Sequence, residues 1–394
     1  MWKRILLAVG CSAIIIVADY LLSNFSFPLF DETESLWWFG YLDSRSEEFP
    51  SDDAVFVNTG IDKTLVPIID DFGDTIGNSP ITDRKALLNF LDILSDSRYK
   101  YIFMDIRFEQ NLKTIHDSAL FSKIASMPRI TIADHRTLGG YSIADSILMA
   151  KGALADYRAN MFSGFSRYEF LQDGRESMPL RAYHELYGKG IEEAGPLYFS
   201  DGRLVNNMLF LPFKAHSGEA AGENGLKRFR YLSADFLGSY DERELRDLVD
   251  DRIVVIGDFD NDIHTTYIGE MPGPLLHYYA FRELEKRSHV VSRPYIIILF
   301  VTYFFVCYAL LGRRDFNAVV LEKLKIKSPM AVLITSLIGW GLLLFFIKVL
   351  LYYSFKISFI ASIPSFVFSS IKTVKAYLAL RKTKQKHMVK DHNL

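Results

Sequence analysis

The stretch RIVVIGDFDNDIHTTYIGEMPGPLLH, residues 252–277, decides the fold of this chain. It opens on Arg252–Ile256, where β-branched residues follow the arginine and predict a short buried strand. Gly257 and the aspartate after it end that strand in a turn, and the apolar spacing over Gly273–Lys286 predicts a helix. A buried strand that leads through a loop into a helix is typical of a sheet covered by helices.

The same alternation of strands and helices occurs upstream. We expect strands at Ala54–Thr59, Tyr101–Met104 and Arg129–Ala133, and helices at Ala86–Leu94, Ser118–Ile124, Met178–Tyr187 and Asp241–Val249. Asp83 or Thr82 is placed to cap the first of these helices. The pattern predicts an α/β domain with a mixed, partly parallel sheet, whose core spans residues 52–291.

Acidic and imidazole side chains follow the predicted strands. Asp258, Asp260, Asp262 and His264 crowd the loop after Arg252–Ile256. Carboxylates also follow the other strands, and ligands of open α/β sheets bind beyond the carboxyl ends of strands. The candidate ligand-binding residues are Asp62, Asp105, Asp258, Asp262, His264, Thr266 and His277.

The chemistry of this acidic loop has three readings. Oxygen clusters suit Ca²⁺ or Mg²⁺, carboxylate pairs can do acid–base work, and an aspartate after a strand commonly caps a turn. The loop lacks the glycine and terminal glutamate of a calcium loop, so a metal stays an open question. The sequence also lacks a Walker loop, a Gly-x-Ser-x-Gly elbow and a His-Glu-x-x-His motif. We therefore expect no catalytic residue and no cofactor.

Long apolar runs stand at both ends of the chain. About 18 apolar residues suffice to cross a bilayer as a helix. We expect four transmembrane helices, one before the domain and three after it, at residues 5–22, 295–311, 330–353 and 357–371. A cleaved signal peptide is the alternative for the first, but no small-x-small cleavage site follows it.

Charge divides the chain in the same way. Residues 23–293 hold 43 acidic and 29 basic side chains, whereas the rest of the chain holds 4 acidic and 16 basic ones. Basic residues flank membrane spans on the cytoplasmic side. We therefore expect residues 1–4, the loop 312–329 and the tail 372–394 in the cytoplasm, and residues 23–293 outside it. An acidic exported domain disfavours nucleic acid as a partner.

Cysteine use fits a bacterial envelope protein. The two cysteines, Cys11 and Cys307, both lie in apolar runs, so the exported domain has none and forms no disulfide. Its stability must come from its own core. We expect a multi-pass protein of the bacterial inner membrane whose main domain faces the periplasm.

The same residues resemble a known family. The pattern over Ile253–His277 is similar to the C-terminal signature of the CHASE type 2 sensor domain, and Val55–Asp62 is similar to the family's first strand. Tyr101–Phe108 resembles its Phe-Asp-x-x-Phe motif, and Ile81–Arg84 stands where the family has Pro-x-x-Arg. The resemblance covers about residues 52–291, and its last third is the most specific part.

The resemblance implies a sensory protein whose extracytoplasmic domain binds a small molecule or a protein. Such proteins typically have one span before the domain, three after it, and then a cytoplasmic output domain. Here only a short basic tail follows the last expected span, so we expect a separate cytoplasmic or membrane partner to carry the output. Two alternatives stay open: a structural subunit of a cell-envelope complex, and a metal-dependent extracytoplasmic hydrolase that uses Asp105, Asp258, Asp262 and His264.

Overall fold

The computed structural model divides the chain into two compact units, Ser26–Val290 and Met1–Phe25 with Val291–Leu394. We call the first of these the inserted domain. The structure describes residues 2–24, 53–70, 72–108, 112–137, 140–143, 145–157, 165, 167–211, 231–233, 241–266 and 269–311. The expected spans at 330–353 and 357–371, the expected cytoplasmic loop and the basic tail lie outside the described residues.

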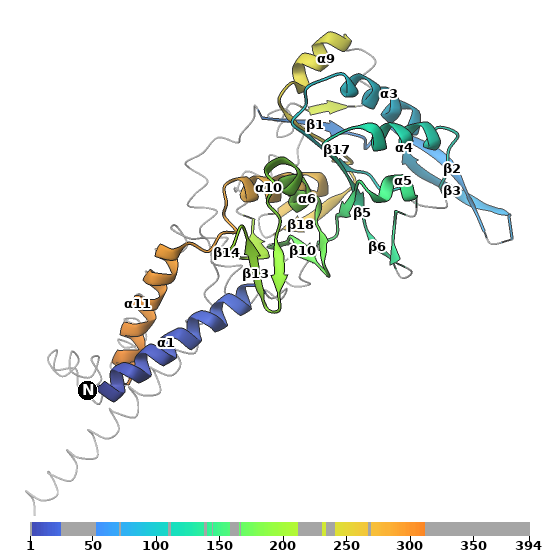
Figure 1. Ribbon diagram of the computed structural model, residues 1–394. Helices are drawn as coiled ribbons and strands as arrows, with labels where there is room; N and C mark the ends of the chain where they lie inside the picture. Colours follow the sequence, from blue (N-terminus) through green and yellow to red (C-terminus); the bar gives the residue numbers. More distant parts are fainter. Residues whose placement is uncertain are drawn as a thin grey trace, which may run out of the picture. The chain divides into compact units, whose positions relative to one another are not determined.

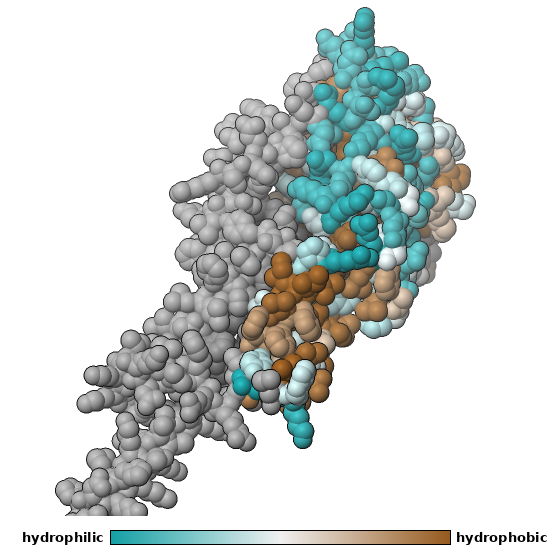
Figure 2. Space-filling view, turned by 60° about the vertical axis from the view of Figure 1, so that its left-hand side comes forward, coloured by the Kyte–Doolittle hydropathy of each residue, from teal (hydrophilic) through white to brown (hydrophobic). Residues whose placement is uncertain are grey.

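Two apolar helices make up the described part of the second unit, α1 (Trp2–Ser23) and α11 (Arg293–Leu310). Within the described residues, α1 is the one helix long and apolar enough to cross a membrane, and α11 contains a shorter apolar stretch, Arg293–Phe305. Figure 2 shows apolar side chains on this unit, and a mostly hydrophilic visible surface on the inserted domain.

The helices α1 and α11 run antiparallel and pack together (Figure 1). The Arg4 guanidinium lies 3.9 Å from the centre of the Tyr308 ring, so the start of α1 adjoins the end of α11. Ile15 and Ile16 pack against a cluster formed by Tyr295, Leu299 and Tyr303. The chain therefore leaves α1 for the inserted domain, and returns from it into α11, at the same end of the helix pair.

A six-stranded sheet with the strand order β16-β1-β17-β4-β5-β8 forms the centre of the inserted domain. Its strands are β1 (Ala54–Asn58), β4 (Tyr101–Asp105), β5 (Ile130–Asp134), β8 (Gly152–Leu154), β16 (Tyr231–Ser233) and β17 (Ile253–Gly257). Each pairing between neighbours in this order is parallel. The carboxyl ends of these strands therefore lie along one edge of the sheet.

The strands β1, β4, β5 and β17 consist mostly of buried aliphatic and aromatic residues, because helices cover both faces of the sheet (Figure 1). Side chains alternate between the faces. Phe56, Phe103 and Val255 pack with α6 (Met178–Tyr187) and α10 (Gly273–Glu285). Their neighbours on the other face pack with α3 (Arg84–Ser95), α4 (Asp117–Ser126), α5 (Ser146–Met149) and α9 (Glu242–Val249).

Side-chain caps and glycine define where the helices start and stop. Asp83 Oδ1 accepts hydrogen bonds from the backbone N–H groups of Lys85 and Ala86, which starts α3 as the sequence predicted. Asp241 caps α9 in the same manner. Gly188, with φ of +67°, ends α6 in the left-handed conformation that glycine adopts without strain.

Short antiparallel pairs complete the described part of the inserted domain. These are β2 (Lys63–Ile69) with β3 (Thr75–Thr82), β6 (Arg136–Thr137) with β7 (Gly140–Tyr141), β9 (Arg167–Glu169) with β15 (Met208–Phe210), β10 (Leu171–Gln172) with β11 (Arg175–Glu176), and β18 (Ile263–Thr266) with β19 (Gly269–Pro272). β12 (Glu192–Ala194), β13 (Leu197–Ser200) and β14 (Arg203–Val205) form a three-stranded sheet.

The predicted α/β class with a partly parallel sheet is confirmed. The described pairings of the central sheet are all parallel, and the described antiparallel pairings lie in separate small sheets. The predicted helix over Met178–Tyr187 is found with the same bounds.

Candidate functional site

Ionisable side chains gather at the carboxyl edge of the central sheet. Asp105 is the last residue of β4, and it pairs in register with Gly257, the last residue of β17. The chain then runs from β17 through a loop and the β18–β19 hairpin into α10. We call the following residues the carboxyl-edge site: Asp105, His135, Asp156, Tyr157, Tyr168, Asp262, His264 and His277.

Asp105, His277 and Tyr168 form the buried part of this site. His277 Nε2 lies 3.4 Å from Asp105 Oδ2, and His277 Nδ1 shares a hydrogen bond of 2.7 Å with the Tyr168 hydroxyl. Burial, together with the charge of Asp262, raises the pKa of Asp105 to about 7. Burial lowers the pKa of His277 to about 3. At neutral pH His277 is therefore uncharged, and Asp105 keeps part of its proton.

Asp262, His264 and Tyr157 form the solvent-facing part. His264 Nε2 lies 2.7 Å from Asp262 Oδ1, and the two side chains are 33% and 41% exposed. The Tyr157 ring stands edge-on to His264, with centroids 4.5 Å apart, and its centroid is 5.8 Å from that of His277. Tyr157 therefore joins the exposed part of the site to the buried part.

Gly273 permits the close approach of Asp262 to the start of α10. A Cβ atom at this position would lie 2.1 Å from Asp262 Oδ2 and 2.9 Å from the Tyr157 hydroxyl. The backbone N–H of Gly273 donates a 2.7 Å hydrogen bond to the Asp262 carbonyl. A carboxylate is also favoured at a helix N-terminus, where backbone N–H groups leave partial positive charge. Glycine here thus fixes where the Asp262 carboxylate lies.

His135 and Asp156 add a third pair. His135 Nδ1 lies 3.0 Å from Asp156 Oδ1, and Asp156 Oδ2 accepts a 2.7 Å hydrogen bond from the backbone N–H of Arg136. Burial opposes a charge on His135, but the hydrogen bond to Asp156 and the charge of Asp105 outweigh it and raise the pKa of His135. The site therefore favours a protonated imidazole beside its carboxyl groups.

Four of the seven predicted residues come together, and three have other neighbours. Asp258 Oδ2 lies 2.8 Å from Lys63 Nζ, and Asp62 lines a separate small cavity beside α3. Thr266 pairs with Phe165 in an isolated parallel bridge. The residues that the carboxyl-edge site unites are Asp105, Asp262, His264 and His277.

Sequence reasoning missed the other members of the site. His135 directly follows Asp134, the last residue of β5, so the rule that located Asp105 applies to it equally. Asp156 and Tyr157 follow the short strand β8, which the sequence pattern did not reveal. Tyr168 lies within an aromatic stretch whose contact with His277 depends on the tertiary fold alone.

The donor set of the carboxyl-edge site consists of carboxyl, imidazole and phenol groups. Within the described residues, no three His, Cys, Asp or Glu side chains are arranged to hold a metal ion. Asp258, which the hydrolase reading required beside Asp105, pairs with Lys63 instead. A partly protonated carboxyl, a neutral imidazole and partly exposed carboxylates can together accept hydrogen bonds and stabilise positive charge.

Comparison of the chain with known protein families, with curated proteins and with solved structures finds no match. Function is therefore inferred from the chain's own geometry and charge.

Proposed function

We propose that this chain is a membrane-anchored sensory protein that binds a small solute outside the cytoplasm, at the carboxyl-edge site. The observation that supports this most is that Asp262, His264 and His277 converge on Asp105, whose carboxyl group has a raised pKa. Perturbed ionisable groups cluster at functional sites. The resemblance to the CHASE type 2 sensor domain rests partly on these same four residues.

The electrostatics of the site favour a solute that carries positive charge. The Asp262 carboxylate contributes to the raised pKa of Asp105, because two like charges disfavour each other. An ammonium or guanidinium group between the two carboxyl groups relieves that repulsion. Binding of such a group at neutral pH therefore drives the proton off Asp105. We propose that this proton is released when a solute binds, and that it takes no part in a catalytic step.

The membrane anchor of this proposal consists of four helices in the bacterial inner membrane. α1 and α11 supply the first two, and the antiparallel packing of α1 and α11 lets the chain leave and re-enter the membrane on one side. The apolar runs 330–353 and 357–371 supply the other two. The basic segments at residues 312–329 and 372–394 then fall in the cytoplasm, and the acidic inserted domain faces the periplasm.

Signal transfer in this proposal passes to another protein. A solute can shift a conformational equilibrium only if it binds two states with different affinity. Solute binding at the carboxyl-edge site would favour one arrangement of the helices, and a separate cytoplasmic or membrane partner would respond to it.

Titration calorimetry on the full-length protein in detergent tests the binding proposal. Small ammonium and guanidinium solutes are titrated at pH 7 in two buffers that differ in ionisation enthalpy. We expect binding with proton release, and loss of that release in Asp105→Asn. Asp258→Asn is the matched control, since Asp258 pairs with Lys63 outside the site. Absence of heat for the whole solute panel, or unchanged proton release in Asp105→Asn, contradicts the proposal.

Cysteine accessibility tests the topology. The two native cysteines are replaced by serine, and single cysteines are placed at Ser95, which is exposed in the inserted domain, or at Lys386 in the tail. We expect a membrane-impermeant maleimide to label Ser95→Cys once the outer membrane is opened, and Lys386→Cys only after the inner membrane is broken. The reverse pattern contradicts the proposed orientation.

A further inference from the structure

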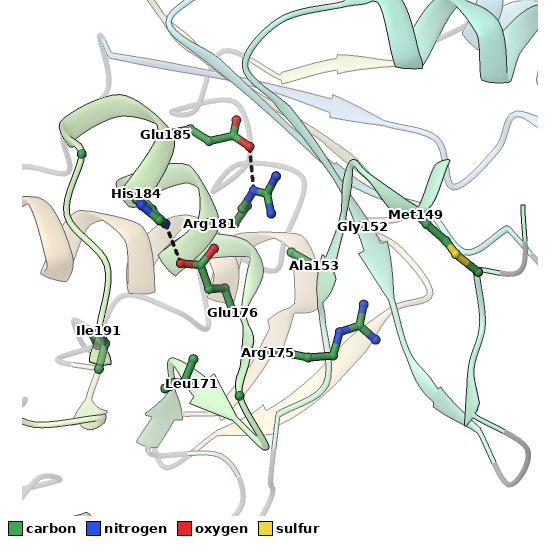
Figure 3. Close-up of a pocket in the computed structure, with 12 residues that line it drawn as sticks. Met149, Gly152, Ala153, Leu171, Arg175, Glu176, Arg181, His184, Glu185 and Ile191 are labelled. Carbon is green, nitrogen blue, oxygen red and sulfur yellow. Dashed lines mark hydrogen bonds and ion pairs between the residues drawn. The ribbon is translucent and has the colours of Figure 1, made fainter. Parts of the chain in front are cut away.

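A second candidate binding site lies away from the carboxyl-edge site. A groove of about 750 Å³ opens between the edge strand β8, the β10–β11 hairpin and α6 (Figure 3). None of its lining residues belongs to the carboxyl-edge site. Sites for small molecules typically measure about 300–1,000 Å³, so this groove has room for a solute of that class.

The lining carries charges of both signs. Arg175 and Arg181 bring two guanidinium groups, Glu176 and Glu185 bring two carboxylates, and His184 adds an imidazole. Arg181 Nε lies 2.6 Å from Glu185 Oε1, and His184 Nδ1 lies 2.7 Å from Glu176 Oε1. Figure 3 shows these pairs side by side on the α6 side of the groove. The two arginines and the two glutamates of the lining therefore carry no net charge together.

Arg175 is held in place by a buried carboxylate. Its Nη2 lies 2.8 Å from Oδ2 of Asp134, whose side chain is 3% exposed, while the arginine side chain is 31% exposed. In Figure 3 this side chain extends from the β10–β11 hairpin toward Met149. A guanidinium held by a buried carboxylate is preorganised to bind a solute carboxylate, because little side-chain entropy is lost on binding.

The other ion pairs of the groove can exchange partners at little cost. The side chains of Arg181 and Glu185 are 37% and 29% exposed, and those of His184 and Glu176 are 52% and 22% exposed. Exposed ion pairs contribute only about 0–1 kcal/mol to stability. A solute carboxylate can therefore replace Glu185 at Arg181, while a solute ammonium group binds the carboxylates.

Part of the lining is apolar. Met149, Ala153, Leu171 and Ile191 line the groove together with the charged groups. Such a surface stabilises an aliphatic group by its removal from water. The groove thus combines sites for a negative group, a positive group and an aliphatic group.

We infer that this groove binds a small aliphatic zwitterion with a free carboxylate and a free ammonium group, either an amino acid or a short peptide. A solute with a single charge would leave one sign of the lining without a matching group, whereas a zwitterion pairs with both. This second site goes beyond the proposed function, which concerns the carboxyl-edge site.

Calorimetry on the full-length protein in detergent separates these solutes. The probes are leucine, the dipeptide leucyl-leucine, N-acetyl-leucine and leucine amide. Both charges should be needed, so we expect each blocked analogue to bind at least about tenfold more weakly than leucine, which matches the loss of one charged hydrogen-bond partner. Tighter binding of leucyl-leucine than of leucine identifies a peptide groove, and the reverse order identifies an amino-acid site.

Variants connect that binding to the groove. Arg181→Gln and Glu176→Gln are each expected to weaken zwitterion binding about tenfold or more. Arg246→Gln is the matched control, because Arg246 is 39% exposed and also forms an i,i+4 ion pair, with Glu242 on α9. Because the carboxyl-edge site is proposed to bind ammonium groups, all titrations are repeated in Asp105→Asn, where the binding that remains is assigned to the groove. This separates the inference from the proposed function.

Three results would overturn the inference. The first is no binding of leucine or leucyl-leucine at millimolar concentration. The second is equal binding of leucine and either blocked analogue. The third is a loss of affinity in Arg246→Gln as large as that in Arg181→Gln. Because the first result comes from the wild-type protein, it holds even if a variant fails to fold.

Discussion

His277 Nε2 lies 3.4 Å from Asp105 Oδ2, and the two side chains are only 1% and 8% exposed. Burial shifts the pKa of each group toward its uncharged form, to about 7 for Asp105 and about 3 for His277. Between these values the proton stays on the carboxyl group, and the pair is neutral. In this pH range the interior of the carboxyl-edge site therefore holds a neutral acid beside a neutral base.

Removal of Asp105 should expose the acid sensitivity caused by His277. The pKa of His277 is depressed from its ordinary value of 6.5 to about 3. Its contribution to stability is therefore fully present above pH 6.5 and is lost as pH falls toward about 3. Protonated Asp105 opposes this trend in the wild type. In Asp105→Asn the free energy of unfolding should thus decrease as pH falls from 6.5 to about 4, by up to about 1.4 kcal/mol per pH unit. Denaturant unfolding at several pH values measures the slope.

His277→Gln should give the opposite slope. Asp105 has a raised pKa, so its contribution is fully present below 3.8 and is lost as pH rises through about 7. Without His277, the free energy of unfolding should decrease as pH rises from 3.8 to about 7. Equal slopes in Asp105→Asn and His277→Gln would contradict the opposed shifts.

Gly273→Ala should displace Asp262 and weaken the carboxyl-edge site. The added methyl group would lie 2.1 Å from Asp262 Oδ2, so the loop or the helix must move. We expect a loss of about 1–3 kcal/mol in unfolding free energy, together with weaker proton-linked solute binding. Gly77→Ala is the control, since a Cβ atom there meets nothing within 4 Å. Similar thermal midpoints for the two variants would contradict the close packing at Gly273.

Much of the fold follows from local sequence patterns. The buried strands of the central sheet are short runs of aliphatic or aromatic residues, and Asp83 and Asp241 cap their helices through neighbouring backbone N–H groups. These features depend on residues only a few positions apart. By contrast, β16 is three residues long, and only its pairing with β1 reveals it as a strand of the central sheet.

The candidate site could be predicted only in part, for a related reason. The strand-end rule found Asp105, and the residues after β17 gave Asp262, His264 and His277. The same rule also selected Asp258, but it cannot foresee that Lys63 on a different strand pairs with that carboxylate. Which strand-end side chains meet depends on loop paths, and local patterns do not encode these.

Asn58→Ala should destabilise the inserted domain. The Asn58 side chain is buried, its Oδ1 accepts hydrogen bonds from the backbone N–H groups of Gly60 and Phe259, and its Nδ2 donates to Asp260. The variant leaves these groups without that partner, and each costs about 1–3 kcal/mol if it remains buried. Asn261→Ala, which removes exposed hydrogen bonds to Asp258, should change stability far less. Thermal unfolding compares the two variants, and an equal effect would contradict this role of Asn58.

Asp117→Asn should be among the most destabilising single changes in α4, because Asp117 compensates a buried cation. Arg84 is 2% exposed, its Nε lies 3.7 Å from Asp117 Oδ1, and its guanidinium carbon lies 4.4 Å from the centre of the Phe108 ring. Burial lowers the pKa of Arg84 to about 10 although Asp117 opposes the shift, so the arginine is still charged at pH 7.

Loss of one partner of a buried ion pair leaves the other charge uncompensated, which costs about 3–5 kcal/mol. Asp92→Asn is the control: Asp92 is 54% exposed and lies 2.6 Å from Lys123 Nζ, so its loss should cost about 0–1 kcal/mol. The double variant Arg84→Met with Asp117→Asn removes both charges and should recover part of the lost stability. If Asp117→Asn proves no more destabilising than Asp92→Asn, or the double variant recovers nothing, Asp117 does not compensate Arg84.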